Sequence, residues 1–123
     1  MTIRSYRDLK VWERAMDLVV ASYKLTELLP KSEAYGLVPQ MRRAAVSTPA
    51  NIAEGHGREH LGDYLHHLSV ANGSLMELET HFLIANRLAY FAISEIEALL
   101  KLTTEVGRML AGLTKRLREH LTP

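Results

Sequence analysis

Residues 94–121 read SEIEALLKLTTEVGRMLAGLTKRLREHL, and this stretch decides the fold class. Apolar side chains recur in it every three or four residues, at Leu99, Leu102, Val106, Leu110, Leu113 and Leu117. That spacing places them on one face of an α-helix. Ser94 followed by Glu97 has the pattern of a capping box and predicts where the helix begins.

The same periodicity recurs upstream and predicts three more helices, at residues 8–29, 36–54 and 60–89. Asp8 is the predicted N-cap of the first, and Pro30 ends it. Its predicted core stripe comprises Leu9, Trp12, Met16, Val19, Val20 and Tyr23. Short connections favour antiparallel neighbours. We therefore expect an all-α fold, an antiparallel up-down-up-down four-helix bundle forming a single domain over residues 1–123.

The composition excludes several classes of protein. The chain has no cysteine, so disulfides, thiol catalysis and thiolate-bound zinc are excluded. Its apolar runs fall far short of the roughly 20 residues of a membrane span, and no signal peptide is recognisable. We therefore expect a cytoplasmic protein with no membrane partner. The 15 Lys and Arg residues nearly balance 14 Asp and Glu residues, so any attraction for nucleic acid must come from local patches.

The first predicted helix has a second apolar stripe. Its members recur at intervals of seven, seven and four residues: Val11, Leu18, Leu25 and Leu29. A helix in a solitary bundle needs one apolar face, so a second must be covered by something. Single exposed leucines are common, and one interpretation is that these four are nothing more. The heptad spacing favours the other interpretation, an interface between copies of the chain.

A polar stripe borders the core face of the second predicted helix. Its members are Gln40, Arg43, Ser47, Asn51 and Glu54. Glu79 of the third helix also borders apolar surface, where a buried carboxylate needs a cation, and Arg42 or Arg43 is the candidate partner. Two interpretations stay open: a ligand or catalytic pocket, and a hydrogen-bonded network that sets the register of the helices. We favour the network.

No motif for catalysis or metal binding stands out. The chain lacks a glycine-flanked serine elbow, a phosphate-binding glycine loop, and the paired Glu-x-x-His motifs of di-iron bundles. His56 and His60 are four residues apart, as are Asp63 and His67, but surface histidines explain this spacing better than a metal site. We therefore expect no enzymatic activity, no metal and no cofactor.

Basic residues gather in two segments. The first segment comprises Arg7, Lys10 and Arg14, and the second comprises Arg108, Lys115, Arg116 and Arg118. In one chain such a cluster is most simply a solvated helix face. In a ring of identical subunits the cluster repeats, and phosphate affinity rises with the number of contacts. The prediction of nucleic-acid binding at these residues therefore depends on the oligomer.

Five segments resemble those of one known family: YRDLKVW (6–12), LPKSEAYGL (29–37), QMRRAAVS (40–47), ANIAEG (50–55) and ANGSLMELE (71–79). In order and spacing they resemble the bacterial four-helix bundle proteins first recognised as products of intervening sequences in 23S rRNA genes. The accessory variability determinant of diversity-generating retroelements belongs to the same group. The resemblance implies a homo-oligomeric ring, a homopentamer, with no established enzymatic activity. It also implies nucleic acid or a reverse transcriptase as the partner of some members.

These observations predict a non-enzymatic, homo-oligomeric binding or scaffold protein. Its predicted partners are copies of itself and RNA, DNA or a nucleic-acid enzyme, bound through basic patches repeated around a ring. The alternative is a protein–protein assembly module that makes no contact with nucleic acid. Dependence of RNA binding on salt separates the two.

Overall fold

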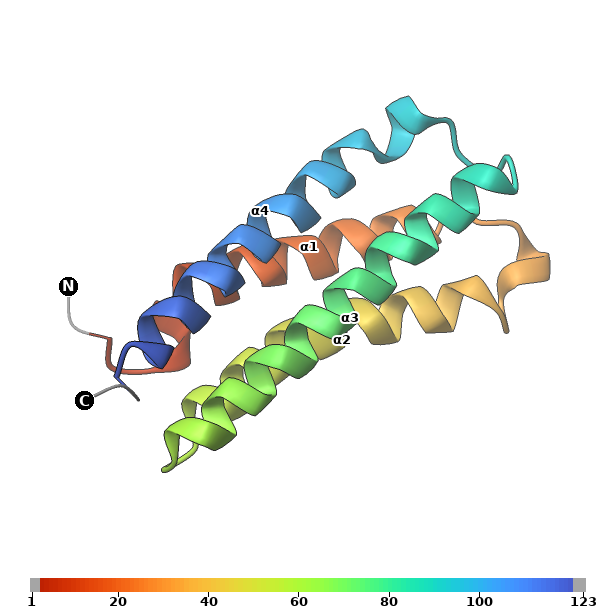
Figure 1. The fold of residues 1–123 in the computed structure, drawn as a ribbon. Coiled ribbons are helices and arrows are strands. Elements are labelled where there is room, and N and C mark those ends of the chain that lie inside the picture. The colour runs from red at the N-terminus through yellow and green to blue at the C-terminus, as the bar shows by residue number, and fades with distance from the viewer. Residues whose placement is uncertain (1–2, 121–123) are drawn as a thin grey trace.

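A computed structural model of the chain describes residues 3–120. Within them lie four long helices, α1 (Lys10–Thr26), α2 (Leu37–His56), α3 (Leu61–Arg87) and α4 (Ile93–Arg118), and two 3-10 turns, η1 (Tyr6–Asp8) and η2 (Lys31–Glu33). The connections lie at alternate ends, so consecutive helices run in opposite directions (Figure 1). The predicted all-α four-helix bundle is confirmed. No helix in this range is both long and apolar enough to cross a membrane.

The first helical segment begins in two parts. The hydroxyl of Ser5 accepts a hydrogen bond from the N–H of Arg7 at 3.1 Å, and the carboxylate of Asp8 accepts one from the N–H of Ser5 at 3.3 Å. Leu9 is then extended and precedes the first turn of α1. The predicted N-cap at Asp8 is therefore wrong, because its side chain closes the short turn η1 instead of capping α1.

The fourth helix begins ahead of its predicted cap. Ala92 precedes the first turn of α4, and the carboxylate of Glu95 accepts a hydrogen bond from the N–H of Ala92 at 2.9 Å. The predicted capping pair, Ser94 with Glu97, lies two residues further along. Alanine has no side-chain acceptor and is a poor cap by propensity, so sequence reasoning prefers the serine.

The structure reverses the two apolar faces predicted for α1. Its core face contains the four residues predicted to form an oligomer interface: Val11, Leu18, Leu25 and Leu29. Ala15 and Ser22 are buried between them and complete a spacing of three and four residues. Because these two side chains are small, a pattern search that gives most weight to bulky residues finds only the larger members, which are spaced mostly seven residues apart. The assignment of the four residues to an oligomer interface is therefore wrong.

The face of α1 that was predicted to be core points largely to solvent. Met16, Val20 and Tyr23 are exposed, whereas Trp12 and Val19 pack partly against the core. The helix thus does carry more apolar surface than one bundle covers. The excess lies on the opposite side from the one predicted.

Glu33 ties together the two connections at the end of the bundle remote from the termini (Figure 1). One carboxylate oxygen accepts a hydrogen bond from the N–H of Leu37 at 3.0 Å, and the other accepts one from the hydroxyl of Tyr90 at 2.7 Å. The bond from the Leu37 N–H, together with that from Tyr90, holds the pKa of Glu33 below its ordinary value. The same bond to Glu33 raises the pKa of Tyr90. This end of the fold is therefore fixed by charge-assisted hydrogen bonds.

Candidate nucleic-acid interface

The C-terminal part of α4 exposes four cations: Arg108, Lys115, Arg116 and Arg118. The sequence has no acid between Glu105 and Glu119. Within residues 3–120, none of the four cations lies within ion-pair distance of a carboxylate. Positive charge near a helix C-terminus also complements the helix dipole, so the arrangement is compatible with a stable helix. We call these four residues the α4 basic surface.

Arg7 and Lys10 lie at the same end of the bundle as the α4 basic surface, because α1 begins where α4 ends (Figure 1). Both side chains are exposed. The guanidinium of Arg7 lies 5.7 Å from the centroid of the Tyr6 ring, which orients it without neutralising its charge. The fold therefore brings cations from both ends of the sequence to one end of the molecule.

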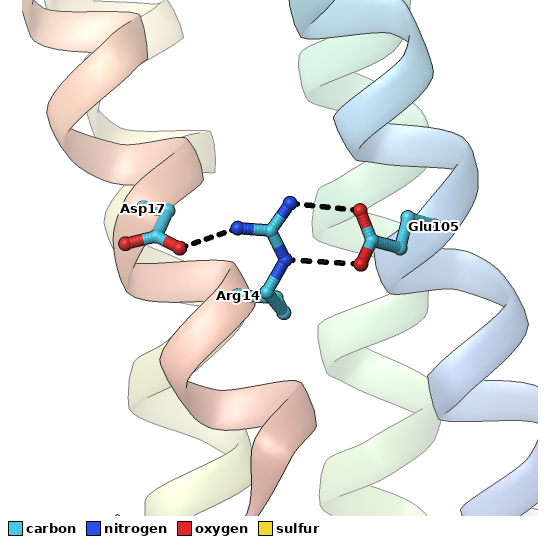
Figure 2. A network of polar contacts seen from close by, with 3 residues as sticks. All are labelled: Arg14, Asp17 and Glu105. Carbon is cyan, nitrogen blue, oxygen red and sulfur yellow. Dashed lines mark hydrogen bonds and ion pairs between the residues drawn. The ribbon is translucent and has the colours of Figure 1, made fainter.

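Arg14 differs from the other predicted cations because two carboxylates hold it (Figure 2). Its Nε and Nη2 donate to the two oxygens of Glu105 on α4 at 3.0 and 2.8 Å, and its Nη1 donates to Asp17 at 2.6 Å. These hydrogen bonds raise the pKa of Arg14, and those to Glu105 hold the pKa of that carboxyl below its ordinary value. A guanidinium with three donors already committed is poorly available to phosphate. We therefore remove Arg14 from the predicted interface: it fastens α1 to α4.

Three residues of the predicted polar stripe belong to a network between α2 and α3. The amide nitrogen of Asn51 donates to the carbonyl and hydroxyl oxygens of Ser47 at 2.9 and 3.0 Å. The Ser47 hydroxyl also lies 2.8 Å from that of Ser74 on α3. The amide oxygen of Asn51 lies 3.1 Å from Nδ1 of His67, and Glu54 lies 3.8 Å from the same nitrogen. The amide oxygen can only accept, so His67 carries its hydrogen on Nδ1.

Arg42 takes part in a different contact, between α2 and α1. Its Nε donates to the hydroxyl of Thr26 at 2.9 Å, and its guanidinium lies 4.5 Å from the centroid of the Tyr23 ring. Gln40 and Arg43 are exposed on α2. The seven predicted residues therefore do not form one continuous network.

Glu79 faces α4 and has a neutral neighbour. The hydroxyl of Thr103 lies 3.3 Å from a carboxylate oxygen of Glu79 and 2.7 Å from the carbonyl of Leu100. With one hydrogen to share, Thr103 donates chiefly to the nearer carbonyl. The predicted pairing of Glu79 with Arg42 or Arg43 is wrong, because Glu79 is only half-buried and needs no cation to compensate for burial.

A groove between α3 and α4 adjoins the α4 basic surface and has a volume of about 540 Å³. Its floor is formed by apolar residues: Leu65, Leu68, Leu110 and Ala111. Its rim is polar and consists of Ser69, Asn72, Thr114, Lys115, Arg118 and Glu119. Sequence reasoning missed this groove because its lining combines residues 65–72 with residues 110–119, which are far apart along the chain. The small side chains of Ser69 and Ala111 are the only signal of it in the sequence.

Two buried polar atoms have no hydrogen-bond partner among the described residues: Ser22 Oγ and His81 Nδ1. Burial lowers the pKa of His81, and the negative charge of Glu77 partly opposes that effect. A neutral imidazole at this position is therefore favoured. Over residues 3–120, no three His, Asp or Glu side chains are grouped so that they could hold a metal ion.

The fold and these surfaces define an all-helical bundle with a basic end, an adjoining groove and an excess apolar face. The family model of the 23S rRNA-intervening sequence protein matches residues 7–112. The chain therefore belongs to the 23S rRNA-intervening sequence protein family, and the predicted family is confirmed.

The fold is similar to that of a solved structure. It is the crystal structure of a protein with unknown function from the S23 ribosomal protein family of Bacteroides thetaiotaomicron VPI-5482. The likeness covers 85% of this chain and 98% of that chain, with a TM-score of 0.79 and 22% sequence identity. At that identity the likeness concerns the fold alone. No curated protein matches the chain significantly.

Proposed function

We propose that the protein is a homo-oligomeric binding protein that engages RNA, DNA or a nucleoprotein through the α4 basic surface. The observation that carries this proposal is the absence of carboxylate partners around these four cations within residues 3–120, in contrast to Arg14. Unpaired surface cations bind a phosphate backbone by releasing its counterions. Arg7 and Lys10, at the same end of the bundle, extend the surface. Repetition of the surface in an oligomer multiplies its affinity.

The excess apolar face of α1 supports the oligomer. Met16, Val20 and Tyr23 on α1 are 39%, 53% and 38% exposed, and Val46 on the neighbouring α2 is 42% exposed. Apolar side chains gathered on adjacent helices are more often covered by another molecule than left in water. A second copy of the chain is the proposed cover, and the family resemblance implies a pentamer.

Replacing Met16 and Val20 together by glutamate is expected to yield folded monomers, because two charges would have to be buried at each contact between neighbouring subunits of a ring. The matched control replaces Val70 and Ile84, which are 38% and 40% exposed on α3, by glutamate. Sedimentation velocity measures the result. An assembly that survives the α1 changes, or that dissociates equally with the α3 changes, contradicts this interface.

Binding to RNA tests the basic surface. A labelled single strand of about 16 nucleotides, near the upper site size of small binding folds, is titrated at several salt concentrations. Exchange of Lys115, Arg116 and Arg118 for glutamine is expected to weaken binding at least tenfold at low salt. It is also expected to flatten the plot of log affinity against log salt by about 0.7 for each phosphate that is no longer neutralised.

The matched control exchanges Lys24, Lys31 and Arg87 for glutamine at the other end of the bundle. These three cations are also exposed, so the net charge changes equally in both triple variants. Equal losses of affinity in the two, or an affinity that does not fall as salt rises, contradict the proposal. The alternative function, protein assembly alone, predicts an intact oligomer that does not retain RNA in a salt-dependent way.

A further inference from the structure

We propose that the groove between α3 and α4 receives an unpaired nucleobase, so that the nucleic acid bound here is single-stranded. This inference rests on the proposed function and names the class of nucleic acid. The groove and the α4 basic surface are continuous, because Lys115 and Arg118 belong to both. A strand whose phosphates contact these two cations therefore passes the mouth of the groove.

The lining of the groove suits the two kinds of surface that a base presents. Of the apolar floor, the half-buried Leu65 and the exposed Ala111 present surface to the face of a flat ring, whereas Leu68 and Leu110 are only 1% and 2% exposed. Ser69, Asn72 and Thr114 on the rim supply hydroxyl and amide groups that both donate and accept, as base edges do. The volume of about 540 Å³ lies within the range of small-molecule sites.

The charges on the rim favour a nucleotide over a neutral apolar ligand. Lys115 and Arg118 line the groove, so their charges favour a ligand that carries phosphates next to an inserted base. Glu119 is the one acid among the residues that line the groove. A carboxylate repels phosphate, but it accepts hydrogen bonds from the amino and imino groups of bases.

Only an unpaired base can enter such a groove. In a duplex each base is stacked on both faces and its Watson–Crick edge is occupied, whereas single strands expose bases that splay out easily. The floor is aliphatic and has no aromatic ring on which a base could stack. The preference for single strands therefore comes from fit and from contacts to base edges.

Three labelled RNA probes of equal length test the inference: a mixed-sequence single strand, its duplex, and a strand made of abasic residues. The intact and abasic strands carry the same phosphate charge, so only the bases distinguish them. The wild-type protein is expected to bind the intact strand about tenfold more tightly than the abasic one, which corresponds to roughly one or two net hydrogen bonds to a base edge. Fluorescence anisotropy at fixed salt gives the affinities.

Ala111→Trp fills the groove from an exposed position on α4. It is expected to reduce affinity for the intact strand to that for the abasic strand, and to leave duplex binding unchanged. Ala98→Trp, at an exposed position of α4 outside the groove, is the matched control and is expected to behave as wild type. Asn72→Ala leaves the packing intact and is expected to cost roughly two- to tenfold for the intact strand alone.

Two failures are distinguishable. If the wild type binds intact and abasic strands equally, and Ala111→Trp changes neither, the groove inference is overturned while the phosphate surface stands. If no probe binds, or if the variant lacking Lys115, Arg116 and Arg118 binds as the wild type does, the proposed function fails and the groove inference fails with it.

Discussion

The contact between α2 and α3 and the contact between α1 and α4 hold the bundle together in different ways. Between α2 and α3 the backbones approach closely: a Cβ added to Gly55 would lie 2.8 Å from the Cβ of His67. Neutral hydrogen bonds, such as that between Ser47 and Ser74, cross this contact. Between α1 and α4 the polar link is the ion pair of Arg14 with Glu105, which is open to solvent.

The α2–α3 contact stabilises the bundle, whereas α4 carries the exposed surfaces described above. More residues of α2 and α3 lie close to one another than residues of α4 lie close to α1 and α3 together. Both the α4 basic surface and the groove lie on this less tightly held helix. Small residues and neutral hydrogen bonds therefore fix the register of one half of the bundle. In the other half, charged side chains face solvent.

The largest expected effect comes from adding one methyl group to each of two glycines. Gly55→Ala forces atoms together in the α2–α3 contact and is expected to lower the free energy of unfolding by about 2 kcal/mol. Gly73→Ala, in the interior of α3 with no atom within 4 Å of the new Cβ, is expected to raise it by about 0.5–1 kcal/mol. Urea denaturation measures both, and two changes of the same sign refute the close-contact interpretation.

Sequence reasoning recovered what depends on the local chain. The helical period identified all four helices, and the spacing of Ser47, Asn51 and Glu54 placed them on one stripe beside the core face of their helix. The orientation of α1 was wrong, although both of its apolar stripes were recognised. Periodicity gives the angle between the two stripes of a helix but does not show which stripe faces the core. The core stripe is the one that lets neighbouring helices approach closely, and in α1 the small residues Ala15 and Ser22 permit that approach.

Contacts between residues far apart in the chain could not be predicted from the sequence for the same reason. Arg14 looked like a member of a basic cluster because its partner Glu105 lies 91 residues away. The groove beside the α4 basic surface exists only once α3 and α4 have a fixed register.

A smaller effect is expected from breaking single polar pairs in each contact. Double-mutant cycles with Asn51→Ala and His67→Ala are expected to give a coupling of about 1 kcal/mol that salt leaves unchanged. Cycles with Arg14→Met and Glu105→Gln are expected to give a weaker coupling that disappears in high salt, because exposed charges are screened. A salt-resistant Arg14–Glu105 coupling would remove the proposed distinction between the two contacts.

The smallest expected effect is the dependence of stability on pH. It distinguishes the Arg14–Glu105 pair from the Asn51–His67 pair. The hydrogen bonds from Arg14, helped by its charge and that of Lys10, hold the pKa of Glu105 below its ordinary value. The folded state therefore binds this proton less readily than the unfolded state. The resulting stabilisation is complete above the ordinary carboxyl pKa of about 4.3 and is lost as pH falls through the lower folded value. Glu105→Gln is expected to reduce the fall in the free energy of unfolding as pH is lowered below about 4.3. Part of that fall is expected to remain, because the pKa of Glu33 is also held below its ordinary value.

The Asn51–His67 pair is expected to keep its coupling over the same acid range. Nδ1 of His67 carries a hydrogen in both the neutral and the protonated ring, so the bond to the Asn51 oxygen needs no change of charge. Glu54, with a carboxylate oxygen 3.8 Å from that nitrogen, faces the ring, but the hydrogen bond to Asn51 does not involve it. Double-mutant cycles repeated at neutral pH and near pH 4 measure the difference. Loss of both couplings together at acid pH would mean that the α2–α3 contact is held by charge after all.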